Sequence, residues 1–155
     1  MEFIVQMSFK WDERYLRLAK EVSTWSKDPS KQVGAIAIGE KGQVLSQGYN
    51  GFPRGVKDTK ERYNHKETKY RYVVHAEQNC IYNATYNGVS LKGASMYVYG
   101  LPVCNECAKA MIQVGIVRIV MPFDGVVPEI WKESCEKAKA LCEEAGVQYS
   151  MMRMK

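Results

Sequence analysis

Long hydrophobic runs are missing from this sequence of 155 residues. No apolar stretch approaches the roughly 18 residues that a membrane-spanning helix needs, so we expect neither a membrane segment nor a membrane partner. The opening residues, MEFIVQMSFK, hold only a short apolar patch with no basic region before it, which argues against a secretory signal. These two absences favour a cytoplasmic protein.

Histidine is scarce, and the cysteines are odd in number. The chain has two histidines and five cysteines, and an odd count without a secretory signal argues against a disulfide scaffold. In a reducing compartment, two cysteines close in sequence more often bind metal or carry out redox chemistry. Such a pair occurs in GLPVCNECAK, which contains Cys104 and Cys107. It admits three interpretations: a redox pair, half of a structural zinc site, or part of a catalytic metal site.

Sequence without a clear pattern is confined to the middle of the chain. Residues 51–72 show neither helical nor strand periodicity, and we expect a basic loop there. Within it, residues 57–72 carry six Lys or Arg against three Asp or Glu, in a chain of net charge +5. Interleaved tyrosines and positive charge suit a phosphate or a nucleic acid, but they suit a solvated loop equally well. A loop of this length in a compact domain is usually functional or partly disordered.

The rest of the sequence predicts one domain over residues 1–155, of which residues 1–10 form an N-terminal extension. Helical spacing of apolar residues predicts a first helix over residues 10–26, with Asp12 as its N-cap. Two apolar runs around a GEKG turn predict a hairpin over residues 33–50. Helices and strands then alternate, which predicts a sheet with parallel later strands and helices on both faces. We expect these helices over residues 75–88, 104–115 and 128–146, and these strands over residues 94–100, 116–121 and 147–152.

A candidate metal site combines the cysteine pair with a histidine. Cys104 and Cys107 lie in the first turn of a predicted helix, and His75 begins the helix before it. The strand between these helices should bring both helix starts to the same edge of the sheet. Both thiolates would gain there from the positive end of the helix dipole. Two thiolates and an imidazole are zinc ligands, and three protein ligands with an open fourth position are typical of a catalytic site.

Glu77 follows His75 by two positions, where a carboxylate can accept a proton from the metal's water without binding the metal. H-x-E followed by C-x-x-C is the motif of the zinc nucleobase deaminases. A redox pair would leave His75 and Glu77 unexplained, since a redox C-x-x-C usually opens a helix after the first strand. A structural zinc would need His65 or Cys80 as a fourth ligand. The remaining cysteines lie on apolar helix faces and are assigned to the core: Cys80, Cys135 and Cys142.

Four segments together resemble the deoxycytidylate (dCMP) deaminase family: HAEQNC, CNECAKAMIQVGI, SKDPSKQVGAIAIG and GYNGFPRG. The resemblance runs from about Trp11 to Tyr149, nearly the whole chain. It implies an α/β fold, the cytidine deaminase-like three-layer α/β/α sandwich with a five-stranded mixed sheet. It also implies hydrolytic deamination of dCMP to dUMP and ammonia, with one Zn²⁺ per chain held by His75, Cys104 and Cys107. In this resemblance Glu77 is the catalytic residue, which moves protons between water and base.

The resemblance also implies contacts to the substrate dCMP. Asn50 in GYNG matches the asparagine that binds the 3′-hydroxyl of the sugar, although an asparagine before Gly51 also suits a left-handed turn. The backbone at Ala76 matches the amide that recognises O2 of the base. Ser26 and Lys27 match the loop that meets the 5′-phosphate.

Regulation is implied in the same way. Members of this family are commonly hexamers that dCTP activates and that dTTP inhibits together with magnesium, so we expect a homo-hexamer with these regulators and Mg²⁺. The regulatory pocket of similar enzymes uses the GYNGFPRG loop and the helix after H-A-E. The matching residues here are Phe52, Arg54, Asn79 and Asn83. Asn79 and Asn83 also suit ordinary polar positions on a helix surface.

Two features depart from the family pattern. Val103 separates Pro102 from the first cysteine, one residue more than in the usual P-C-x-x-C, so the turn before Cys104 should differ. The segment MPFDG lacks the phosphate-binding side chain that many relatives carry there, so Lys27 or the basic loop should bind the phosphate. Two other functions stay open: a deaminase of tRNA or single-stranded DNA bases, and a non-catalytic zinc-stabilised binding module. The GYNG loop speaks against the first, and we expect no nucleic-acid partner.

Overall fold

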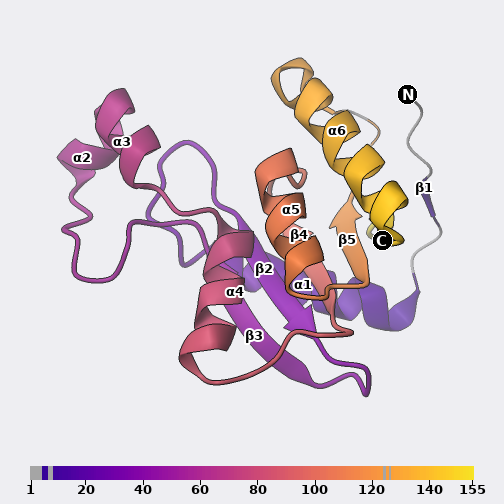
Figure 1. Cartoon of the computed structure of the whole chain (residues 1–155). Helices are drawn as coiled ribbons and strands as arrows, with labels where there is room; N and C mark the ends of the chain where they lie inside the picture. The colour runs from indigo at the N-terminus through magenta and orange to yellow at the C-terminus, as the bar shows by residue number, and fades with distance from the viewer. Residues whose placement is uncertain (1–4, 7–8, 124, 126) are drawn as a thin grey trace.

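A mixed β-sheet forms the centre of the molecule (Figure 1). The computed structural model describes residues 5–6, 9–123, 125 and 127–155. Within them the sheet has six strands in the order β1-β6-β5-β4-β2-β3. Strand β2 is antiparallel to β3 and β4, whereas β4, β5, β6 and β1 run parallel, as predicted for the later strands. The strands are β1 Val5–Gln6, β2 Gly34–Ile38, β3 Val44–Tyr49, β4 Ser95–Tyr99, β5 Arg118–Pro122 and β6 Gln148–Met152.

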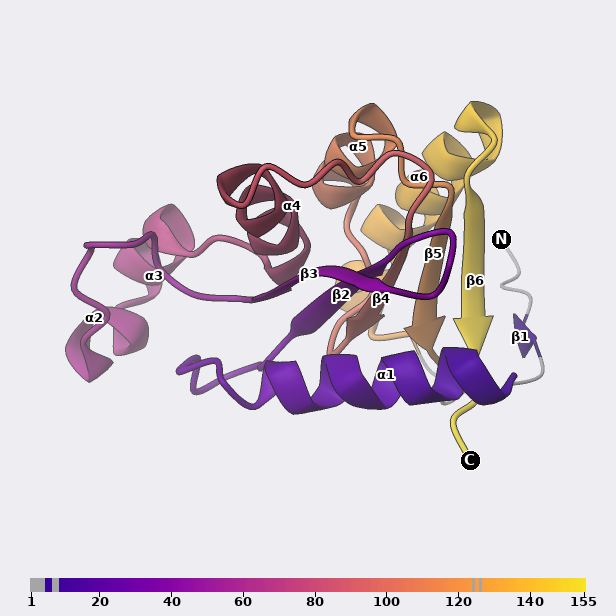
Figure 2. The same cartoon turned by 90° about the horizontal axis from the view of Figure 1, so that it is seen from below.

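Helices cover both faces of the sheet, which gives the three layers α/β/α. Figure 2 shows α1 on one face and α4, α5 and α6 on the other. The expected α/β sandwich is therefore confirmed, with β2 to β6 as its five-stranded mixed sheet and β1 as a short edge strand. None of the helices in the described ranges is long and apolar enough to cross a membrane. The helices are α1 Lys10–Ser23, α2 Lys60–Asn64, α3 Lys66–Tyr72, α4 Ala76–Tyr86, α5 Asn105–Gln113 and α6 Glu129–Ala145.

Two hydrophobic cores lie on opposite faces of the sheet. Alternate residues of β4 serve both, because Tyr97 packs toward α1 while Met96 and Val98 pack into the core that α4 and α5 cover. The run GAIAI of β2 is buried along its whole length, as expected for a strand covered on both faces. The three cysteines assigned to the core are indeed buried free thiols: Cys80, Cys135 and Cys142.

Asp12 does not cap α1, contrary to the prediction. The N-cap is Phe9, and Asp12 lies in the first turn of the helix. Its carboxylate faces the sheet, where Arg118 at the start of β5 donates to both oxygens at 2.7 and 2.8 Å and Tyr97 also donates to it. A buried charge is stable only when it is paired, so this tertiary contact decides the position of Asp12.

The ion pair of Asp12 and Arg118 should contribute strongly to stability. We expect Asp12→Asn to lower the free energy of unfolding by about 2–4 kcal/mol, because Arg118 would keep a largely buried charge without its counter-ion. Urea unfolding at pH 7 measures this change. The exposed Glu21 of the same helix offers the control Glu21→Gln, which should shift the unfolding midpoint little. A loss of similar size in both variants would contradict the assignment.

The same pair makes stability depend on pH. Burial alone would raise the pKa of Asp12, but Arg118 and Tyr97 bind the carboxylate and hold its pKa below the usual value. A lowered folded-state pKa stabilises the fold above the unfolded pKa of about 3.9. This contribution is therefore lost as the pH falls through the folded pKa, and Asp12→Asn should lose less stability than the wild type on acidification.

The expected basic loop over residues 51–72 contains helices α2 and α3 instead of irregular chain. Both begin at a side-chain cap: Thr59 Oγ1 accepts from Arg62 N at 3.2 Å, and His65 Nδ1 accepts from Thr68 N at 3.3 Å. These caps satisfy backbone donors that a short helix leaves free. Residues 1–4 and 7–8 of the expected N-terminal extension, and Asp124 of MPFDG, lie outside the described residues.

Candidate metal centre and the adjoining pocket

The three predicted zinc ligands lie together. His75 Nδ1 is 3.3 Å from Cys107 Sγ and 3.6 Å from Cys104 Sγ, and all three ligand atoms lie within 4.8 Å of one another. His75 is the N-cap of α4 and Cys104 is the N-cap of α5. Both helices run antiparallel to β4, which connects them, so both helix starts reach the carboxyl end of that strand, as the sequence predicted.

The two thiols differ in their affinity for protons. Hydrogen bonds from Cys107 and His75 stabilise the Cys104 thiolate and lower its pKa to about 4, against the effect of burial. The pKa of Cys107 is raised, because its thiol donates to Cys104 and because it is buried. The bond to Cys104 likewise raises the pKa of His75. A divalent cation bound by these three groups would displace the protons that they share.

The donor set fits zinc. Two thiolates and one imidazole are the ligands that Zn²⁺ prefers, and three protein ligands leave one position of a tetrahedron open. Across the described ranges, this is the one group of three such residues close enough to hold a metal ion. His65, the fourth ligand that a structural site would need, instead bonds Thr68 at 2.8 Å on the distant helix α3. Cys80 is fully buried against Ser46.

Glu77 lies in the first turn of α4 and is only 4% exposed. Burial raises the pKa of its carboxyl group, although His75 and Cys107 oppose the shift. A carboxyl group with a raised pKa exchanges a proton more readily near neutral pH than an exposed glutamate does. Glu77 therefore has the position and the proton affinity of an acid and base beside the metal ligands.

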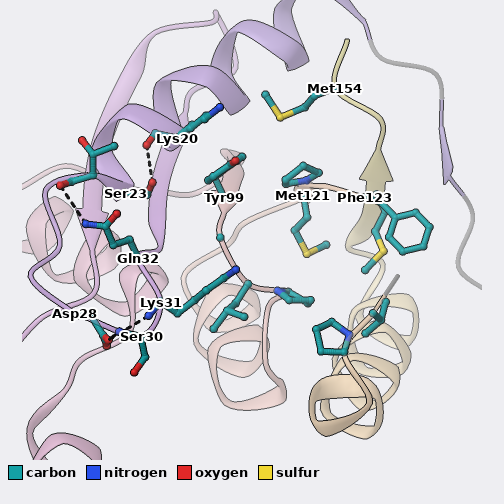
Figure 3. A pocket seen from close by; sticks show the side chains of 18 of the residues that line it. Lys20, Ser23, Asp28, Ser30, Lys31, Gln32, Tyr99, Met121, Phe123 and Met154 are labelled. Atoms are coloured by element: carbon teal, nitrogen blue, oxygen red, sulfur yellow. Dashed lines mark hydrogen bonds between the residues drawn. The ribbon is translucent and has the colours of Figure 1, made fainter. Parts of the chain in front are cut away.

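A pocket of about 1010 Å³ adjoins the centre at the carboxyl ends of β4, β5 and β6 (Figure 3). One wall is the loop over residues 28–32, and another is formed by residues 100–102, which Val103 connects to Cys104. Figure 3 shows Lys20, Lys31 and Gln32 on one side and Met121, Phe123 and Met154 on the other. His75 and Glu77 do not line this pocket, so it lies beside the metal centre rather than around it.

The cationic residues that line the pocket differ from the lysine that was predicted to meet the phosphate. Lys27 is exposed and forms an ion pair with Asp58 at 3.2 Å, and Ser26 is buried with its hydroxyl bonded to Asn50 O at 2.8 Å. Neither lines the pocket. The cations that do are Lys20, Lys31 and Arg153, and no sequence motif pointed to these three as phosphate ligands. Lys31 lies in the same SKDPSK motif as Lys27, and only Lys31 lines the pocket. The contacts of Ser26 and Lys27 to the phosphate stay predictions.

Asn50 contacts the loop over residues 28–32, and Ala76 follows His75 along the chain. Asn50 is buried, with Oδ1 accepting from Val33 N at 2.9 Å and Nδ2 donating to Lys31 O at 2.9 Å. The alternative of a left-handed turn is wrong, since no described residue except glycine has a positive φ. Ala76 begins α4, so its N–H is one of the free donors of a first helical turn. The contacts of Asn50 and Ala76 to substrate stay predictions.

The side chains of Asn79 and Asn83 tie α4 to the edge strand β3. Asn79 Nδ2 donates to Tyr49 O at 2.8 Å, and Asn83 Nδ2 donates to Gln47 O at 2.7 Å. They are therefore more than solvated surface amides, because they satisfy carbonyls of an unpaired strand edge.

Phe52 and Arg54, the loop residues of the predicted regulatory site, lie close to this edge. The ring of Phe52 stacks on Tyr63 with centroids 4.3 Å apart. Arg54 donates to Asn83 Oδ1 and lies over the ring of Tyr86, 5.1 Å from its centroid. The structure thus brings Arg54 and Asn83 together, while a regulatory role stays a prediction.

Val103, the extra residue before the first cysteine, is fully buried in the core. Its backbone N–H donates to Met121 Sδ at 3.5 Å. The turn before it depends on Gly100, whose φ of +123° and whose approach to Gln32 O leave no room for a Cβ. The chain therefore accommodates the extra residue by pointing its side chain inward.

Comparisons with known proteins agree with this geometry. Residues 9–122 match the family model described as the cytidine and deoxycytidylate deaminase zinc-binding region. The deoxycytidylate deaminase of Homo sapiens is 41% identical over 145 residues, covering 90% of this chain and 78% of the relative, and that of Mus musculus is 39% identical with the same coverage. The dCMP deaminase of cyanophage S-TIM5 has the same fold, with a TM-score of 0.71 and 23% identity over 94% of this chain and 100% of the other.

Proposed function

Because this chain belongs to the cytidine and deoxycytidylate deaminase family, we propose that it hydrolyses dCMP to dUMP and ammonia, as a single cytoplasmic domain over residues 1–155. The observation that carries the proposal is the group of His75, Cys104 and Cys107 beside the buried carboxyl group of Glu77. The similarity to deoxycytidylate deaminases at 39–41% identity supports dCMP, rather than another cytosine compound, as the substrate of this chain.

Each residue of the centre has a defined part in this reaction. His75, Cys104 and Cys107 would hold zinc, which when bound supplies the Lewis acidity that activates the attacking water. Glu77 accepts a proton from this water and delivers it to N3 of the base. The water oxygen forms a bond to C4, and Glu77 then moves the second proton of this oxygen to the exocyclic nitrogen. The bond between C4 and that nitrogen breaks, so that one water is consumed and ammonia leaves. The N–H of Ala76 would donate to O2 of the base.

The sugar and phosphate would extend from the centre toward the pocket. Asn50 is the proposed ligand of the 3′-hydroxyl, and Ser26 supports the loop that carries the phosphate end. We place the 5′-phosphate near Lys31, because Lys31 lines the pocket while Lys27 pairs with Asp58 outside it.

Lys31→Gln should therefore raise the KM for dCMP about tenfold, the equivalent of one weakened charge-assisted hydrogen bond of ~1.4 kcal/mol, with kcat nearly unchanged. Steady-state kinetics over a range of dCMP concentrations measure the split. Lys27→Gln, in the same motif, is the matched control and should change KM little. A larger rise in KM for Lys27→Gln would instead support the phosphate ligand that the sequence predicted.

The function is tested by adding dCMP to the zinc-loaded protein and following ammonia release and the loss of cytosine absorbance. Cytidine-containing tRNA and a single-stranded DNA oligonucleotide are the comparison substrates, because the basic helices α2 and α3 could face a polynucleotide. Turnover of a polynucleotide without turnover of dCMP would overturn the proposal. Zinc binding without deamination of any cytosine compound would indicate a non-catalytic module.

We further propose a homo-hexamer regulated by dCTP as activator and by dTTP with Mg²⁺ as inhibitor, through Phe52, Arg54, Asn79 and Asn83. The contact of Arg54 with Asn83 beside the edge strand β3 supports this choice of residues. Sedimentation gives the oligomer, and dCMP saturation curves with each nucleotide give the regulation. Unchanged rate and cooperativity at high concentrations of both nucleotides would exclude it.

A further inference from the structure

Residues 52–73 leave the body of the protein and return to it beside the metal centre. Their ends are joined by an antiparallel bridge, in which Gly51 N donates to Val74 O at 3.1 Å and Val74 N donates to Gly51 O at 2.8 Å. Asn50 precedes this bridge and His75 follows it. Residues 52–73 include helices α2 and α3. Figures 1 and 2 both show these two helices to one side of the sheet, away from α5 and α6.

The loop over residues 28–32, which walls the pocket, is organised around the buried carboxylate of Asp28. Asp28 Oδ1 accepts from Ser30 N at 2.8 Å and from Lys31 N at 3.2 Å, and Oδ2 accepts from Asn50 Nδ2 at 3.3 Å. These bonds turn the chain so that residues 28–32 all face the pocket. The side chain of Asp28 therefore shapes the wall against which a substrate would lie.

Lys69 of α3 supplies the counter-ion of this carboxylate from 41 residues away. Its Nζ is 2.8 Å from Asp28 Oδ1, and the two side chains are only 15% and 5% exposed. A second ion pair, Lys27 with Asp58, joins the same two segments at 3.2 Å, but its side chains are 64% and 45% exposed. Exposed pairs contribute little, whereas a buried carboxylate that loses its partner is strongly destabilised. Residues 52–73 are therefore held against the loop over residues 28–32 mainly through Lys69.

We infer that Lys69 is a positioning residue for the sugar-phosphate end of the substrate, acting through Asp28 on the pocket wall. Lys69 lines neither the pocket nor the metal centre, so it acts through the loop rather than on the reacting atoms. Its contribution should appear in substrate affinity, because Glu77 and the metal ligands are held by α4 and α5 instead. This inference rests on the proposed deamination of dCMP and extends it to a residue outside the site.

The test is the kinetics of Lys69→Met, which keeps the length and apolar stem of the side chain. KM for dCMP should rise about tenfold while kcat stays within roughly threefold, since displacement of the reacting atoms themselves would cost on the order of 100-fold. Lys69→Arg restores the charge and should recover most of the affinity. Asp58→Asn, which removes the exposed pair between the same segments, and Arg71→Met, on the same helix, should both match the wild type.

Two further measurements separate positioning from general unfolding. Hydrogen exchange at the amides of residues 30–33 should quicken in Lys69→Met and not in Asp58→Asn, whether or not dCMP is turned over. If Lys69→Met does not fold, the double variant Lys69→Met/Asp28→Asn removes the unpaired charge and should fold with the same rise in KM. An unchanged KM, or a loss confined to kcat, would overturn the inference. Absence of dCMP turnover in the wild type would overturn the proposed function alone, because the exchange result stands without it.

Discussion

Replacing Glu77 with glutamine should abolish deamination while the metal stays bound. The amide keeps the size of the side chain but cannot accept the proton of the attacking water, and loss of a general acid and base lowers rates on the order of 10²–10⁴-fold. The substitution also removes a carboxyl group that is only 4% exposed, so the fold should not be weakened. Turnover of dCMP, zinc content and the melting temperature measure the three parts of this expectation.

Glu106 provides the matched control for Glu77. It lies between the two cysteines of the motif, but its side chain is 65% exposed and pairs with Lys109 at 2.8 Å. Glu106→Gln should retain nearly full activity and full zinc content. Retention of more than a tenth of the activity in Glu77→Gln would show that another group carries the proton. Loss of zinc in that variant would instead place Glu77 among the metal ligands.

Removal of a sulfur ligand should have the second large effect. Cys107→Ala is expected to reduce bound zinc from about one ion per chain to nearly none, with turnover falling in parallel. Stability should fall as well, because a ligand present at 1,000 times its Kd stabilises the folded state by about 4.1 kcal/mol. Elemental analysis after dialysis and thermal unfolding with and without a chelator measure both changes.

Cys142 separates the loss of a ligand from the loss of a buried thiol. Cys142 and Cys107 are both fully buried, but Cys142 lies on α6 outside the metal centre. Cys142→Ala should therefore keep its zinc and respond to a chelator as the wild type does. Full zinc content in Cys107→Ala would contradict the assignment of the ligands.

The metal centre could be predicted because its residues depend on topology more than on detail. An alternating order of helices and strands places the starts of α4 and α5 at one edge of the sheet. His75 and Cys104 are the N-caps of those helices and Cys107 lies in the first turn of α5, so their spacing along the chain was sufficient. The same order predicted the parallel strands and the helices on both faces.

Residues whose role depends on a distant partner could not be predicted in this way. Asp12 looked like a helix cap because its partner Arg118 is 106 positions away. Helices α2 and α3 have only five and seven residues, too short to show apolar periodicity. Lys27 and Lys31 belong to one motif, and only the turn around Asp28 decides which of them reaches the pocket.

Because Gly51 and Val74 are joined by a bridge, the chain between them should tolerate an insertion. Loop closure depends only weakly on length, since doubling a flexible loop adds about 0.6 kcal/mol of entropic cost. At Gly55, where φ is +82°, an added Cβ would meet nothing within 4 Å, so the chain there borders open solvent. The turn at Gly55 is therefore the place in this fold to splice in a reporter peptide or an affinity tag. The bridge would hold Asn50 and His75 in register, and the contact of Lys69 with Asp28 would be retained.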